Sequence, residues 1–161
     1  MPGLLATMHD DHARLDALIE RLLDPVQAND PGGIVRVWGD FEHGLAAHLE
    51  AEEQCLLPGF ERVDTAEAAS IRSDHAKLRR LVAEVGAGIE LQIVREHTVR
   101  QLVHFLRSHA VMEEQTLHRW ADLRAPAQAK AAVVERLAEA LHVRRRATDS
   151  RPDAPASGDS R

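Results

Sequence analysis

Apolar residues recur at spacings of three and four along most of the chain, which is the period of an amphipathic α-helix. The first such stripe predicts a helix over about residues 4–23, and the run NDPGG separates it from the next stripe. Asp30 followed by Pro31 is a typical cap and first-turn pair and predicts the start of a second helix. Pro58 and Gly59 are expected to stop that helix.

Two further stripes predict two more long helices. Asp64 with Glu67 three residues later has the pattern of a capping box and starts a third helix, which Gly86 and Gly88 are expected to end. A fourth helix is predicted over about residues 90–121. Connections as short as these favour antiparallel neighbours.

The pattern therefore predicts an all-α fold, an antiparallel up-down-up-down four-helix bundle that occupies residues 1–124. After Pro126 an Ala-rich stretch with a thinner apolar stripe predicts an extra C-terminal helix over residues 125–146. Residues 147–161 are rich in Pro, Ser and Asp and poor in apolar side chains. We expect them to form a disordered tail.

Polar residues with metal-binding chemistry interrupt the apolar stripes in a repeated arrangement. Each half of the chain carries the letters DHA, followed one helix later by H-x-x-x-E-E-Q. A histidine and a glutamate four residues apart on a helix point in nearly the same direction. The chain is thus two copies of one helix-pair unit. The inward-facing candidates are His12, His48, Glu52, His75, His109 and Glu113.

Two interpretations of these residues are open. A single histidine on an apolar stripe is commonly a hydrogen-bonded core residue. Burying two carboxylates and four imidazoles together without a cation would, however, cost several kcal/mol per charge, which favours a metal site. Imidazole with carboxylate suits Fe, Mn or Zn, and two carboxylates able to bridge favour two metals. Iron is the first choice, with Mn or Zn as substitutes.

Composition excludes several other classes of protein. The 161-residue chain has a formal net charge of −6 with both signs interspersed, which argues against nucleic acid and membrane surfaces as partners. The hydrophobic fraction of 44% allows a sizeable core. The one cysteine forms no internal disulfide, and the first residues do not resemble a signal peptide. We expect a cytoplasmic protein.

The paired H-x-x-x-E-E-Q motifs and the two DH segments resemble the haemerythrin family, specifically the bacterial haemerythrin-like HHE cation-binding domains, over about residues 4–121. The resemblance implies a non-haem di-iron centre, bridged by oxo or hydroxo, with an open position for O2 or a similar small ligand. It implies that His12 and His48 hold one iron and that His75 and His109 hold the other. Glu52 and Glu113 would bridge them.

The chain departs from the oxygen-carrying members at Arg79. Those members have a further histidine four residues after the third-helix ligand, and an arginine does not ligate a metal. The iron beside His75 would then have fewer protein ligands. Simple reversible carriage of O2 is therefore in doubt.

The remaining candidates carry less weight. His9 is a candidate extra ligand or supporting donor, and Cys55 is interpreted mainly as a packing residue with a redox role as the alternative. Glu53 and Glu114 each follow a bridging glutamate and are expected to face outward. Outer-face or surface positions are expected for His43, His97, His104, His118 and His142.

Three functions remain open for such a site. The first is reversible binding of O2, NO or iron for sensing or storage, with a small molecule as partner. The second is a redox enzyme that reduces peroxide or oxidises a small substrate at the open di-iron site. The third is a helical interaction module whose metal is structural. We favour the first, and the protein partner stays unassigned.

Overall fold

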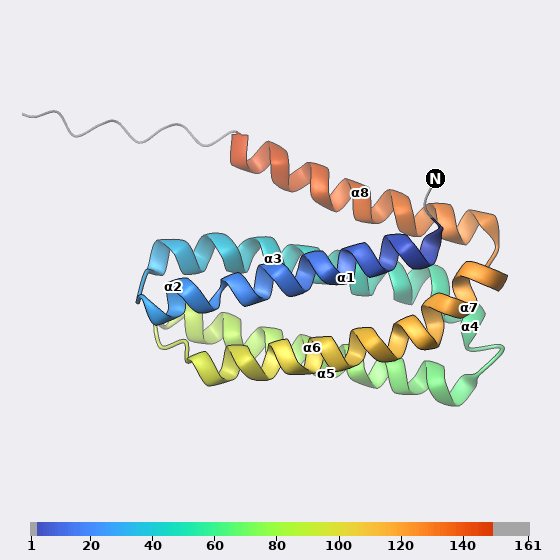
Figure 1. Ribbon diagram of the computed structural model, residues 1–161, viewed down its shortest axis with the longest axis horizontal. Coiled ribbons are helices and arrows are strands. Elements are labelled where there is room, and N and C mark those ends of the chain that lie inside the picture. The colour runs from blue at the N-terminus through green and yellow to red at the C-terminus, as the bar shows by residue number, and fades with distance from the viewer. Residues whose placement is uncertain (1–2, 150–161) are drawn as a thin grey trace, which may run out of the picture.

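The computed structural model describes the backbone of residues 3–149 and the side chains of residues 3–142. Four long helices run antiparallel and form the bundle: α1 (Leu4–Arg21), α3 (Pro31–Ala51), α5 (Thr65–Glu90) and α6 (Glu96–Gln115) (Figure 1). The predicted all-α up-down-up-down architecture is confirmed. The short helix α2 (Leu23–Gln27) continues α1 beyond Arg21, because Pro25 lies in its first turn, where a missing N–H is tolerated.

Two of the long helices continue into further helical segments at one end of the bundle. Helix α3 passes into a π-helical turn, η1 (Glu52–Leu56), and then into α4 (Leu57–Phe60). Helix α6 is interrupted at Thr116 and continues as α7 (Leu117–Arg124). The π-helical turn begins at Glu52, and the break at Thr116 lies three residues after Glu113. Side chains beyond each glutamate therefore point in directions that a regular α-helix would not give them.

The predicted helix starts agree with the structure at two caps. The Asp30 side chain accepts a hydrogen bond from the Gly33 backbone N–H at 3.1 Å, and Asp64 accepts one from the Glu67 N–H at 2.9 Å. The predicted end of the third helix is wrong, since α5 runs past Gly88 to Glu90. A Cβ on Gly88 would lie 3.2 Å from the Val94 Cα, so the segment that follows α5 packs closely against this glycine.

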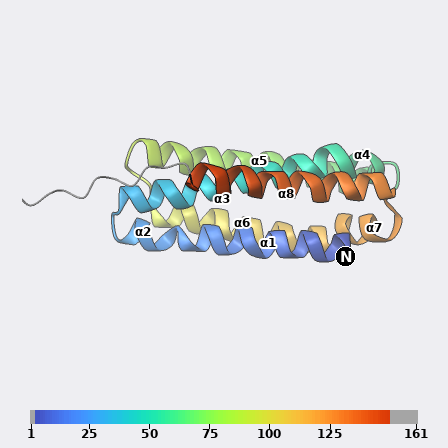
Figure 2. The same ribbon diagram turned by 90° about the horizontal axis from the view of Figure 1, so that it is seen from above.

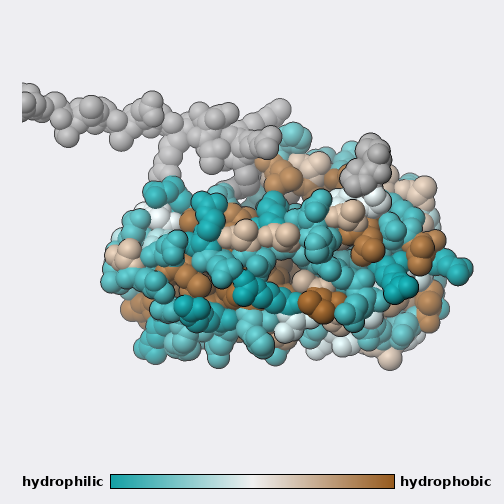
Figure 3. Space-filling view, in the orientation of Figure 1, coloured by the Kyte–Doolittle hydropathy of each residue, from teal (hydrophilic) through white to brown (hydrophobic). Residues whose placement is uncertain are grey.

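The predicted C-terminal helix is present as α8 (Ala127–Asp149) and packs against α3, η1 and α1 (Figures 1 and 2). It extends three residues beyond the predicted boundary at residue 146. Most of the expected disordered tail, residues 150–161, lies outside the described residues. Polar side chains cover most of the face seen in Figure 3, and apolar ones are scattered among them.

Two apolar clusters fill the bundle on either side of a polar layer. One cluster includes Leu15, Phe41 and Leu102, and the other includes Met8 and Leu117 near α4, α7 and α8. Between them lie the buried polar side chains of His12, His48, Glu52, His75, His109, Glu113 and His118. The fold thus places one polar site inside an otherwise apolar core. Among the described helices, none combines the length and apolarity needed to cross a membrane.

Candidate metal centre

The structure brings the six predicted ligand candidates together at one level of the bundle. His12 lies midway along α1, His48 in the last turn of α3, and Glu52 at the first position of η1. Helix α5 contributes His75, and α6 contributes the remaining pair. All six are at most 7% exposed, and both carboxylates are fully buried.

Each of the two glutamates places one oxygen near each pair of histidines. Glu52 Oε1 lies 3.3 Å from His48 Nε2, while its Oε2 lies 3.3 Å from His75 Nε2. Glu113 Oε1 lies 3.1 Å from both His75 Nε2 and His109 Nε2, while its Oε2 lies 3.5 Å from His12 Nε2. This is the arrangement that two bridging carboxylates between two cations require.

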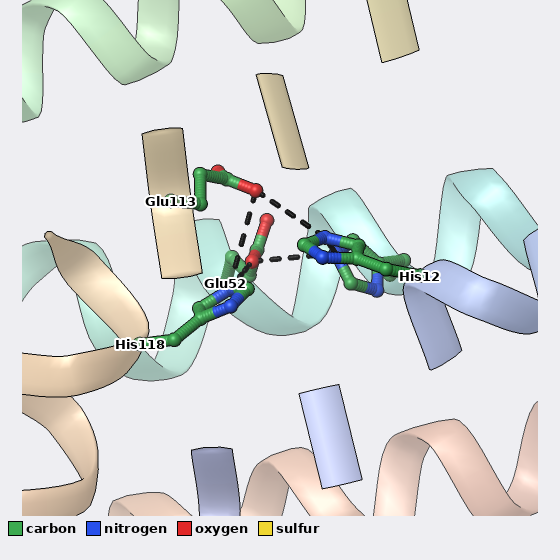
Figure 4. Close-up of side chains that lie close together, drawn as sticks. His12, Glu52, Glu113 and His118 are labelled. Atoms are coloured by element: carbon green, nitrogen blue, oxygen red, sulfur yellow. Dashed lines mark hydrogen bonds and ion pairs between the residues drawn. The ribbon is translucent and has the colours of Figure 1, made fainter. Parts of the chain in front are cut away.

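A seventh residue, His118, belongs to the same cluster, and its predicted surface position is wrong. The side chain is fully buried, and its Nε2 contacts Glu52 Oε1 and lies 4.0 Å from Glu113 Oε2. Figure 4 shows His12, Glu52, Glu113 and His118 converging on a common centre. Single ligand atoms from His12, His48, Glu52, Glu113 and His118 all lie within 4.8 Å of one another.

The break at Thr116 explains why helical periodicity failed at His118. A residue five positions after Glu113 would point about 140° away on an uninterrupted helix. Thr116 instead has φ −115° and ψ −87°, and its N–H is shared between the carbonyls of Met112 and Glu113. This rotates α7 and turns His118 inward. Thr116 is a residue type common at helix N-termini and is the N-cap residue of α7, but its hydroxyl donates back to the Met112 carbonyl at 2.9 Å instead of capping α7.

The outer nitrogens of the imidazoles face acidic side chains, and two of these contacts form within a repeat. Asp11, next to His12, lies with Oδ2 2.8 Å from His48 Nδ1. Asp74, next to His75, makes the equivalent approach to His109 Nδ1 at 3.6 Å. The aspartate of each DH segment therefore faces the Nδ1 atom of the histidine on the following long helix.

The second glutamate of each E-E pair contacts an imidazole of the other repeat. Glu53 Oε1 lies 2.9 Å from His75 Nδ1, and Glu114 Oε1 lies 3.2 Å from His12 Nδ1. The predicted outward orientation of Glu53 and Glu114 is therefore wrong, because these side chains lie toward α5 and α1 and contact the imidazoles there. A carboxylate that accepts from Nδ1–H leaves Nε2 with its lone pair directed into the site.

Three of these carboxylates are held in turn by a positively charged or imidazole group. Arg79 donates from its two Nη atoms to Glu53 Oε1 and Oε2, at 2.7 and 2.9 Å. Arg14 pairs with Asp11 at 2.7 Å, and His9 Nδ1 lies 3.0 Å from Glu114 Oε1. His9 is 63% exposed, so its place is that of a supporting group beyond His12.

The buried charges shift one another's pKa values strongly. Burial alone would lower the pKa of His75, but its hydrogen bond with Glu113 and the close carboxylate of Glu52 raise it to about 10. Burial likewise opposes ionisation of Glu52, yet the charge of His48 and the hydrogen bond with His118 hold its pKa well below the usual range. Carboxylates that stay ionised in an apolar core need positive charge beside them, supplied by protons on imidazole or by metal ions.

The donor set fits metal ions better than internal hydrogen bonding. Among the described residues, buried atoms without a hydrogen bond include Glu52 Oε2, Glu113 Oε2 and both ring nitrogens of His109. Such atoms are costly in an apolar core unless another partner satisfies them. Imidazole nitrogens and carboxylate oxygens are the donors that iron, manganese and zinc accept.

The other histidines and the cysteine lie outside this cluster. His97, His104 and His142 are exposed, as predicted, while His43 is half-buried. Cys55 is half-buried against the apolar cluster near α4 and α7, which agrees with a packing role.

The comparisons with known proteins agree with this geometry. No solved structure matches the chain. A protein of Nostoc sp. (strain PCC 7120 / SAG 25.82 / UTEX 2576) named DNA nickase is 31% identical over 111 residues, which cover 66% of this chain and 30% of that protein. The model of the Hemerythrin HHE cation binding domain matches residues 3–121. The chain therefore belongs to the hemerythrin HHE cation-binding domain family.

Proposed function

We propose that this chain is a non-haem di-iron protein that binds O2 or a related small ligand, such as NO or peroxide. The observation that carries the proposal is the placement of Glu52 and Glu113, each of which directs one oxygen to either side of the site. Two irons in this position would supply redox-active centres with coordination positions free for a small molecule. Mn or Zn would fit the same donors.

The surrounding side chains determine how such a centre behaves. Three carboxylates outside the cluster, those of Asp11, Glu53 and Glu114, hydrogen-bond to Nδ1 atoms, which holds these rings in place and strengthens their inner nitrogens as donors. Asp74 lies farther from His109 Nδ1, at 3.6 Å. The fully buried setting of Glu52 and Glu113 excludes bulk water. A ligand that reaches the site must therefore be small.

Reduction of peroxide is the second candidate, and Arg79 favours it. This residue stands where oxygen carriers have a further histidine, and its guanidinium pairs with Glu53 instead of entering the site. The side of His75 and His109 is thus left with two imidazoles. A ferrous pair held by His12, His48, His75, His109 and the two glutamates would supply the two electrons that the conversion of H2O2 and two protons into two waters requires. An external reductant must then restore the ferrous state.

The first test is metal analysis of protein purified from its native host, with ultraviolet and visible spectra before and after O2, azide and H2O2. We expect about two irons per chain and a spectrum that azide and peroxide change. Glu52→Ala should lower the metal content toward one or none, because it removes one bridge. Two metals retained at wild-type affinity in Glu52→Ala would contradict the bridging assignment.

Nicking of DNA requires its own test, because this chain matches only 30% of the Nostoc protein named DNA nickase. The net charge of −6 does not favour binding to a polyanion. The metal-loaded chain is therefore incubated with supercoiled plasmid. Metal-dependent nicking that Glu52→Ala abolishes would replace small-ligand binding as the better function.

A further inference from the structure

The two sides of the site have unequal numbers of donors. Three imidazoles, those of His12, His48 and His118, face one oxygen of each bridging glutamate, and we call this side the three-imidazole position. Two imidazoles, those of His75 and His109, face the other oxygens, and we call this side the two-imidazole position. Counting one oxygen from each glutamate gives five protein donors on the first side and four on the second.

The rings of the three-imidazole position are grouped closely enough to share one ion. The ring centroid of His12 lies 4.7 Å from that of His48 and 5.1 Å from that of His118. His12 Nε2 and His48 Nε2 are 3.0 Å apart, so both nitrogens are directed at the same point. His118 Nε2 approaches that point from α7, beside Glu52 Oε1.

The two sequence repeats differ at the position that makes the numbers of imidazoles unequal. Aligning the two E-E-Q segments places His118 at the same position as Leu57 of the first unit. Leu57 is also fully buried, so both units direct this position into the core. One unit supplies an imidazole there and the other supplies an apolar side chain that cannot bind a cation.

We propose that His118 is a metal ligand and that it makes the two metal positions unequal. The three-imidazole position, with five protein donors, binds its ion more tightly and loads first, and the two-imidazole position, with four, exchanges its ion more readily. This inference rests on the proposed two-metal site.

A different role for His118 makes a different prediction. If its ring only donated a hydrogen bond to Glu52, its loss would disturb a carboxylate that serves both positions, and both would weaken together. If it is a ligand of one ion, its loss weakens that ion selectively. The number of affected binding steps therefore separates the two roles.

The test is calorimetric and visible-spectrum titration of the metal-free protein with Co²⁺. The wild-type chain should bind two ions in two steps whose affinities differ by about tenfold or more. His118→Ala should weaken the tight step by roughly 10–100-fold, the range seen when groups around a metal are removed, and leave the weak step nearly unchanged. Added imidazole should restore the tight step. His97→Ala, at an exposed position, is the matched control.

His118→Gln covers the case in which His118→Ala does not fold. Its amide N–H still donates to Glu52 and its volume is similar, but a neutral amide is a weaker ligand for these metals than imidazole. We expect the same selective loss, with an unchanged circular dichroism spectrum.

The outcomes separate this inference from the function on which it rests. A wild-type chain that binds no Co²⁺ would overturn both. Two wild-type steps that persist unchanged in both His118 variants, or that weaken equally, would overturn the role of His118 alone. A tight step that is lost in His118→Ala but retained in His118→Gln would assign His118 to hydrogen bonding. That result would also overturn its role as a ligand.

Discussion

Arg79 shows how one side chain can influence the site from outside it. It lies one helical turn after His75, but its side chain is 48% exposed and its guanidinium holds both oxygens of Glu53. Glu53 Oε1 also faces His75 Nδ1. The sequence allowed prediction of an open position beside His75, and the structure adds that Arg79 restrains the carboxylate that orients this ring.

Replacing Arg79 with histidine should add a nitrogen donor on the side of the two-imidazole position. We expect the O2-dependent absorbance of the reduced, iron-loaded protein to decay about tenfold more slowly than in wild type, because the second iron is less open to water and oxidant. Stopped-flow spectroscopy after mixing with O2 measures the decay. Arg80→His, at the exposed neighbouring position, is the control. An unchanged decay in Arg79→His, or a wild-type complex that persists for hours, would contradict the open-position argument.

At the scale of helices, the sequence predicted which helices form and two of their N-terminal caps. It did not predict which way side chains point beyond Glu52 and Thr116. Apolar periodicity placed His12, His48, Glu52 and His75 correctly, because each lies inside or at the end of a regular helix. The π-helical turn that starts at Glu52 and the break at Thr116 depend on packing between helices, which no local propensity encodes. His118 was mispredicted for that reason.

The exchange of carboxylates between repeats was missed for a related reason. Glu53 and Glu114 lie off the central stripe, and a single-helix projection cannot show that a neighbouring helix covers them. The signal was present in the sequence as the repeated DH and E-E pairs. These pairs can be interpreted only from the assembled bundle, because each acid contacts an imidazole on another helix.

The two DH aspartates should differ in their effect on metal binding. Asp11 is 7% exposed and lies 2.8 Å from His48 Nδ1, whereas Asp74 is 32% exposed and lies 3.6 Å from His109 Nδ1. Asp11→Asn should weaken the binding of one Co²⁺ by roughly 10–100-fold, the usual range for such outer groups, and Asp74→Asn should have a smaller effect. Titration of both variants with Co²⁺ measures the difference. Equal losses of Co²⁺ affinity in the two variants would contradict the prediction that the shorter, more buried contact of Asp11 matters more.

For the molecule as a whole, the polar layer is both the site and the weakest part of the core. Two apolar clusters stabilise the bundle on either side, while seven buried polar side chains between them depend on one another for charge balance. Protons on the imidazoles provide that balance without metal, and metal ions replace them. Stability of the fold should therefore depend jointly on metal and pH.

The last prediction follows from the sign of the His75 shift. Its pKa is raised from 6.5 to about 10 in the metal-free fold, so its protonation stabilises that fold fully below about pH 6.5, and the stabilisation is lost as the pH rises through 10. Metal ligation requires the neutral ring, so bound protons oppose metal at low pH. The gain in melting temperature on adding metal should consequently be small near pH 6 and grow toward pH 9.

Differential scanning calorimetry of the chelated and Zn²⁺-loaded chain measures this gain. At a free metal concentration of 100 times Kd the gain in free energy of unfolding is about 2.7 kcal/mol. This corresponds to roughly 5–10 °C in Tm for a chain of this size. Glu113→Gln, which removes one bridging charge, should reduce the gain at every pH, while His97→Ala should leave it unchanged. Melting curves that superimpose with and without chelator across this pH range would show that the buried imidazoles and carboxylates satisfy one another without a metal.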